Sequence, residues 1–137
     1  MNDLFYFTKA QVQLDDIASS AISEKYKVKT RTLGATRFLY IVLNDQEEKN
    51  WEVFDIETDF NSFDIEPRKK IDSYQPLSSF VFTFPSTTLP ELTSFLKKII
   101  DKYGGWIGMD DDMLIVYNAD NIATITKHIY SGSSLGE

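Results

Sequence analysis

The stretch SFVFTFPSTTLPELTSFLKKIIDKYGG, residues 79–105, decides the fold because it joins a strand pattern directly to a helix pattern. Phe80, Phe82 and Phe84 occupy alternate positions near its start. Alternate residues of a strand point to the same side, so these three rings would share one face. Aromatic side chains in such a row bury much apolar surface. The pattern therefore predicts a strand with one face in the core.

The second half of this stretch predicts an amphipathic helix. Thr88 and Glu91 have the spacing of a capping box, and Pro90 suits a first turn, where a backbone N–H is not needed. Gly104 is a residue type that often follows the last turn of a helix. The apolar positions repeat as a helix with one buried face requires: Leu92, Phe95, Leu96, Ile99, Ile100 and Tyr103.

Toward the C-terminus, residues 106–109 and 113–117 predict a hairpin around Asp110, Asp111 and Asp112. Asn118 or Asp120 could cap a short final helix. The tail 131–137 is rich in Gly and Ser, and we expect it to be flexible.

The N-terminal half shows a similar order of patterns. Residues 4–8 (LFYFT) predict a strand, and the helix that follows has an apolar face formed by Leu14, Ile17, Ala18, Ala21 and Ile22. Asp15 and Asp16 favour its first turn. Residues 26–32 alternate and predict a strand with one basic face, which is typical of a solvated sheet edge: Lys25, Lys27, Lys29 and Arg31.

Two further strands are predicted in the middle of the chain. Residues 37–43 (RFLYIVL) are nearly continuously apolar, which predicts a central strand buried on both faces. After a polar turn at 44–50, residues 51–59 (WEVFDIETD) alternate, with Phe54 and Ile56 expected toward the core. Residues 60–75 contain Pro67 and few apolar repeats, so we expect a surface loop.

These patterns predict an α+β fold, with a mixed or mainly antiparallel sheet and two main amphipathic helices packed on one face. Both halves contain strand, helix, strand and strand in this order, which allows two βαββ units in one sheet. We expect residues 1–130 to form a single domain and residues 131–137 a flexible tail.

The charge of the chain is concentrated in one segment. The net charge of the 137 residues is −7, yet residues 45–66 contain nine acidic residues and one base, for a charge of −8, so the rest sums to +1. Nucleic acid is not an expected partner, because binding it usually needs a basic surface. No signal peptide and no membrane-length apolar run are present, so we expect a cytoplasmic protein that does not bind membranes.

The acidic segment predicts an interaction with a protein partner. Asp55, Glu57 and Asp59 would share the strand face opposite Phe54 and Ile56. An acidic patch attracts a basic partner and accelerates association, although a charge run of this kind also suits a solvated sheet face. The residues expected to contact the partner are Glu47, Glu48, Trp51, Asp55, Glu57, Asp59 and Asp64.

Catalytic and metal-binding patterns are weak. The chain has no cysteine and one histidine, His128, so a thiolate nucleophile is excluded and a zinc site or a histidine-based triad is not expected. Asp110–Asp112 lacks the ligand spacing of a calcium-binding loop, and Gly104–Gly108 lacks the pattern of a phosphate loop. We therefore expect no catalytic, cofactor-binding or metal-binding residue.

The stretch SFVFTFPSTTLPELTSFLKKIIDKYGGWIGMDDDMLIVYNADNI, residues 79–122, resembles the C-terminal part of small bacterial immunity-type proteins, which neutralise toxins exchanged between competing bacteria. The shared features are an aromatic strand, an amphipathic helix, a Tyr-Gly-Gly break, a hairpin through acidic residues and an Asn-Ile helix start. The resemblance implies a small, acidic, cytosolic protein without enzymatic activity. No functional residue is carried over, because no motif fixes one.

The sequence therefore predicts a non-enzymatic binding protein, an immunity protein whose acidic surface neutralises a basic toxin. Two alternatives stay open. One is a carboxylate-based enzyme or a small-ligand domain, with Mg²⁺ at Asp110–Asp112. The other is a structural or oligomerisation module that uses an exposed edge strand.

Overall fold

The structure, a computed structural model, describes residues 2–43, 46–56, 69, 71, 73, 75–109, 116–118, 120 and 122. Its elements, in chain order, are β1 (Asn2–Thr8), α1 (Leu14–Ser23), β2 (Lys27–Leu33), β3 (Thr36–Leu43), β4 (Gln46–Asp55), β5 (Ser78–Phe84), the 3-10 helix η1 (Ser86–Thr88), α3 (Leu89–Tyr103), β6 (Trp106–Met109) and β7 (Val116–Tyr117). The order β1-α1-β2-β3 and the order β5-α3-β6-β7 are the two predicted βαββ units, and β4 lies between them in the chain.

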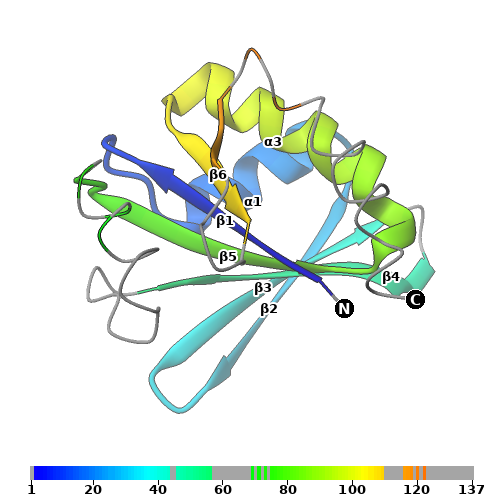
Figure 1. The fold of residues 1–137 in the computed structure, drawn as a ribbon. Coiled ribbons are helices and arrows are strands. Elements are labelled where there is room, and N and C mark those ends of the chain that lie inside the picture. Colours follow the sequence, from blue (N-terminus) through cyan, green and yellow to red (C-terminus); the bar gives the residue numbers. More distant parts are fainter. Residues whose placement is uncertain are drawn as a thin grey trace.

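The described strands form one sheet in the order β2-β3-β4-β5-β1-β6-β7, and all neighbouring strands are antiparallel (Figure 1). The predicted α+β class with a mainly antiparallel sheet is confirmed. β1 lies between β5 and β6, so β5 and β6 run in the same direction with an antiparallel strand between them. The first strand in the chain is thus a central strand of the sheet.

Both helices lie on the same side of the sheet, as predicted (Figure 1). Leu14, Ile17 and Ala21 of α1 share one buried cluster with Leu92 and Phe95 of α3. The same cluster contains the sheet residues that face the helices, among them Leu4, Tyr6, Leu39, Ile41, Trp51, Val53, Phe80, Phe82, Phe84 and Ile107. The phenylalanine row of β5 is therefore in the core, as its alternation predicts. None of the helices in the described ranges is both long enough and apolar enough to cross a membrane.

A smaller cluster lies on the opposite side of the sheet. It contains Phe5, Phe7, Val81 and Ile71, with Phe54 and Ile56 half-buried against it. Residues 69, 71 and 73 are helical and Ile71 is buried, so the prediction of a surface loop over 60–75 is wrong at these positions. The Ile71 side chain therefore packs against this side of the sheet.

Two local predictions are corrected by the packing. Thr88 precedes α3, but its hydroxyl donates to the carbonyl oxygen of Pro85 at 2.7 Å and accepts the indole N–H of Trp51 at 3.0 Å, so it does not cap the helix. The spacing to Glu91 therefore does not produce a capping box. Ile22 is the exposed member of the predicted apolar face of α1, whose buried members are Leu14, Ile17 and Ala21.

The end of α3 is fixed to β1 by hydrogen bonds. The hydroxyl of Tyr6 donates to the carbonyl oxygen of Gly104 at 2.7 Å, and the hydroxyl of Thr8 donates to that of Tyr103 at 3.1 Å. Gly105 has a φ of +100°, and a Cβ atom there would lie 2.2 Å from the carbonyl oxygen of Phe7. Only glycine allows the chain to leave α3 and pass this close to β1.

We expect Gly105→Ala to destabilise the domain by about 3–5 kcal/mol, because the new methyl group meets backbone atoms and the φ angle is unfavourable. Gly34→Ala is the matched control. Gly34 also has a positive φ, +59°, but no heavy atom lies within 4 Å of a Cβ atom there. We expect a cost of roughly 1–2 kcal/mol for Gly34→Ala. Urea unfolding measures both, and equal costs would contradict the close approach to β1.

Candidate functional site

The strands β2, β3 and β4 turn one face toward the helices and the other face away from them. Leu39, Ile41 and Val53 face the helices, so the residues between them point to the other side. The cross-strand register aligns these residues into rows. We call this surface the open face and define it by Lys27, Lys29 and Arg31 on β2, Phe38 and Tyr40 on β3, and Glu52 and Phe54 on β4.

Phe38 and Tyr40 give the open face an aromatic centre. Both are half-buried, although β3 lies between two other strands. The rings of Phe38 and Phe54 pack with their centroids 5.3 Å apart and a 58° angle between their planes. The prediction that strand 37–43 is buried on both faces is therefore wrong at Phe38 and Tyr40, although Val42 on the same face is buried. Half-exposed aromatic side chains of this kind are enriched in protein interfaces.

A row of polar side chains crosses the open face through Tyr40. The register pairs Lys29 with Tyr40, Tyr40 with Glu52, Glu52 with Thr83 and Thr83 with Asp3. The hydroxyl of Thr83 donates to the carboxylate of Asp3 at 2.7 Å. The row therefore starts at a base on the sheet edge and reaches carboxylates on β4 and β1.

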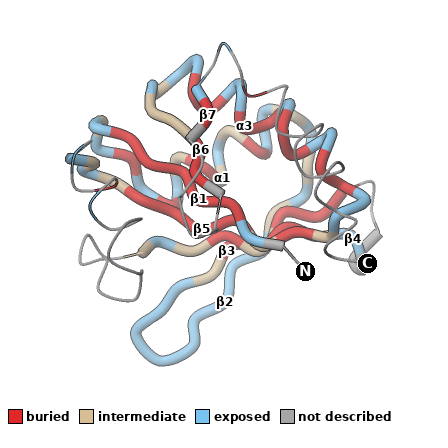
Figure 2. Tube along the Cα trace, viewed as in Figure 1, coloured by how far each residue is buried: buried red, intermediate tan, exposed pale blue. Residues whose placement is uncertain are grey.

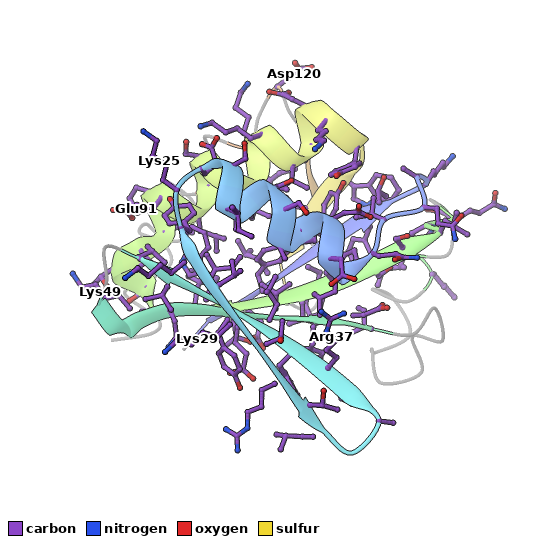
Figure 3. All side chains as sticks on the ribbon, turned by 180° about the vertical axis from the view of Figure 1, so that it is seen from behind. Lys25, Lys29, Arg37, Lys49, Glu91 and Asp120 are labelled. Carbon is purple, nitrogen blue, oxygen red and sulfur yellow. The ribbon has the colours of Figure 1, made fainter. Side chains whose placement is uncertain are left out.

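Basic and acidic residues lie on different strands of this part of the sheet. Residues 25–43 contain five bases and no acid, whereas residues 45–66 have a charge of −8. Because β3 pairs with β4, these two segments are neighbours in the sheet. Figure 3 shows Lys29 directed away from the helices, while Arg37 lies on the helix side, where its guanidinium bonds the Asp15 carboxylate at 2.7 Å.

Trp51 is not available to a partner, and its predicted role in the interface is wrong. Its side chain is 0% exposed, lies between Tyr26 and Phe95 with ring centroids 5.3 Å and 5.6 Å away, and donates its N–H to Thr88. β4 begins at Gln46 rather than after a polar turn at 44–50, and on this strand Trp51 and Val53 face the helices. Phe54 and Ile56, expected in the main core, belong to the smaller cluster.

The other predicted contact residues are placed only in part. Asp55 is exposed at the end of β4 and, two residues from Val53, points to the side opposite Glu52. Glu47 and Glu48 belong to β4, but their side chains lie outside the described residues. The remaining acidic candidates and His128 also lie outside the described residues: Glu57, Asp59, Asp64, Asp110, Asp111 and Asp112. Glu52, which was not predicted to contact the partner, lies on the open face.

Phe38, Tyr40 and Glu52 are the site residues that sequence reasoning missed. A usable signal is present in the preceding strand. Lys27, Lys29 and Arg31 alternate on one face of it, and a strand that pairs with it must have its corresponding face near solvent. The basic alternation of 26–32 therefore predicts that strand 37–43 also has an exposed face. The apolar composition of 37–43 alone does not predict this.

The described residues contain no group of three or more His, Cys, Asp or Glu side chains placed to hold a metal ion. Comparisons with protein-family models, with curated proteins and with solved structures gave no match to this chain. The open face carries aromatic rings at its centre and charges of both signs around them.

The most perturbed titratable group that the structure describes belongs to the core rather than to the open face. Burial raises the pKa of Tyr6 to about 12, and its hydroxyl donates to the Gly104 carbonyl. Burial also raises the pKa of Tyr26, which packs against Trp51. Both shifts favour the neutral phenol. Tyr6 therefore acts as a fixed hydrogen-bond donor between β1 and the end of α3.

The raised pKa of Tyr6 predicts a loss of stability at high pH. The unfolded chain releases this proton near the ordinary pKa of 10.0, whereas the folded chain keeps it until about 12, so stability falls as the pH rises between these values. Tyr6→Phe should cost about 1 kcal/mol at pH 7 through the lost hydrogen bond. The difference between the two proteins should shrink near pH 11, as measured by urea unfolding. An equal difference at both pH values would contradict this assignment.

Proposed function

We propose that this chain is a non-enzymatic protein-binding domain that contacts a basic partner through Tyr40 and Glu52 of the open face and through the acidic segment 45–66. The observation that carries the proposal is the exposure of Phe38 and Tyr40 on a sheet face whose opposite side holds both helices. Figure 2 shows this asymmetry along the chain: the strands are buried near the helices and become exposed toward the end of the β2–β3 hairpin.

The residue types of the open face support a protein partner. Tyrosine, phenylalanine and arginine are favoured in the centres of protein interfaces, and a polar rim supplies specificity. Tyr40 has carboxylate Glu52 on one side of its row and Lys29 on the other, so a partner would bury its ring while charged groups orient the contact.

The acidic segment supports a basic partner. Glu52 is the described acidic residue of this segment that lies on the open face, and Asp55 is exposed on the opposite side of the same strand, near its end. A surface of one sign accelerates the encounter with a partner of opposite sign, and the acceleration is lost as salt rises. An immunity protein that neutralises a basic toxin is the biological role we propose, and the resemblance of residues 79–122 agrees with it.

The test starts from a basic protein retained by the immobilised chain at low salt and released at high salt, identified by mass spectrometry and then purified. Tyr40→Ser should weaken its binding about 10-fold, as loss of an interface aromatic does. Glu52→Gln, and separately the triple change Asp55→Asn, Glu57→Gln and Asp59→Asn, should slow association and reduce its dependence on salt. Surface plasmon resonance separates the association and dissociation rates.

Asp101→Asn is the matched control for charge. Asp101 is exposed on α3, on the far side of the sheet, where it pairs with Lys97 at 3.3 Å. The Asp101→Asn substitution removes one negative charge without changing the open face. If Asp101→Asn slows association as much as Glu52→Gln does, the effect is one of net charge and the proposed surface is wrong.

A further inference from the structure

The edge strand β2 is exposed along almost its whole length. It is the terminal strand of the described sheet, with β3 as its neighbour on one side. All its residues are exposed except Val28, which is half-buried. Figure 2 shows the exposed part of β2 continuing through the turn into the start of β3, away from the helices. An exposed sheet edge can pair with an extended segment of another chain.

The register of the hairpin shows which backbone groups of β2 face outward. Leu33 pairs with Thr36 across the two-residue turn Gly34–Ala35, so these two residues form the hydrogen-bonded pair that closes the hairpin. Hydrogen-bonded and non-hydrogen-bonded pairs alternate along an antiparallel ladder. Arg31 and Lys29 therefore bond to β3. The N–H and C=O groups of Thr30, Thr32 and Val28 point away from β3, toward the free edge.

The side chains of β2 select the chemistry of a strand that would pair with this edge. Lys27, Lys29 and Arg31 project on the open face at alternate positions, with Thr30 and Thr32 on the other face. In an added strand, the side chains beside the three cations would also come from alternate residues. Opposite charges at such positions stabilise pairing and like charges oppose it.

We infer that the β2 edge binds an extended acidic segment of a partner protein, which adds to the sheet as an eighth strand with carboxylates at alternate positions beside Lys27, Lys29 and Arg31. A second copy of this chain is disfavoured, because pairing β2 with β2 would place the cations of both strands together. This site uses the backbone of the sheet edge and the cations at the border of the open face, whereas the proposed contact with a basic partner depends on Tyr40 and Glu52, and either can hold without the other.

A single-stranded nucleic acid is the competing polyanion. Its phosphates accept hydrogen bonds but do not donate them, so they cannot satisfy both the outward N–H and the outward C=O groups of Thr30 and Thr32. The charge of −7 over the whole chain also opposes a long polyanion more than a short segment with three carboxylates. A peptide strand fits both the backbone and the side chains of the edge.

The experiment uses a capped peptide with glutamate at alternate positions and valine or threonine between them. Its binding to the ¹⁵N-labelled chain is followed by NMR, together with the hydrogen exchange of the Thr30 and Thr32 amides. We expect chemical-shift changes centred on β2 and slower exchange of both amides. A peptide of the same composition with contiguous glutamates, and the same peptide N-methylated at its pairing amides, should each bind on the order of 10-fold more weakly.

Thr30→Pro tests the backbone contact without changing any charge. It removes an outward N–H, and an edge strand tolerates proline at such a position. The variant should weaken peptide binding on the order of 10-fold. Thr30→Val keeps the N–H and a β-branched side chain, and should bind as the unchanged protein does. Lys29→Pro, which removes an inward N–H, should lower the melting temperature by roughly 10 °C, whereas Thr30→Pro should lower it much less.

Three results would overturn the inference: equal peptide affinity of Thr30→Pro and Thr30→Val, shift changes centred away from β2, or tighter binding of a single-stranded oligothymidine than of the peptide. If Thr30→Pro does not fold, the N-methylated peptide decides the question with the unchanged protein. Glu52→Gln should leave peptide binding intact, and Thr30→Pro should leave the basic partner bound. These two variants therefore separate a failure of this site from a failure of the proposed function.

Discussion

The position of β1 between β5 and β6 is the constraint on which the rest of the fold depends. Through this strand, the segment before α3 and the segment after it belong to one sheet. Gly105 brings the chain against the Phe7 carbonyl, and Tyr6 bonds the carbonyl of Gly104. The Tyr6 side chain itself is fully buried in the core. These contacts fix the C-terminal end of α3 against β1.

The helices cover one side of the sheet, and this leaves the other side with two different environments. Near β1 and β5 the outer side is buried by a small apolar cluster that includes Ile71. Near β2, β3 and β4 it carries half-exposed aromatic residues and charges. The basic segment 25–43 and the acidic segment 45–66 meet where β3 pairs with β4. The aromatic and charged side chains that reach solvent on this side of the sheet are therefore gathered on the three strands away from β1.

The sequence predicts the positions of the helices and strands better than it predicts which face of each strand is buried. The phenylalanine alternation at 80–84 and the apolar repeat of α3 each have one interpretation, and both are confirmed. The segment 51–59 has apolar residues in both phases, and only the fit of Trp51 between Tyr26 and Phe95 decides that Trp51 faces the main core. Thr88 matches a capping box, yet a residue 37 positions away uses its hydroxyl. Long-range contacts of this kind leave no local signal, whereas the exposure of Phe38 and Tyr40 is signalled only by the basic alternation of the neighbouring strand.

The placement of β1 also has a consequence for the synthesis of the chain. The hydrogen bond between Tyr6 and Gly104 joins residues 98 positions apart. At about 5–20 residues per second, the ribosome needs on the order of ten seconds to make this intervening length. Within that time β5 is made and can pair with one edge of the apolar segment LFYF, whereas the other edge has no partner until β6 follows. One edge of this apolar segment therefore stays unpaired until most of the sheet has been synthesised.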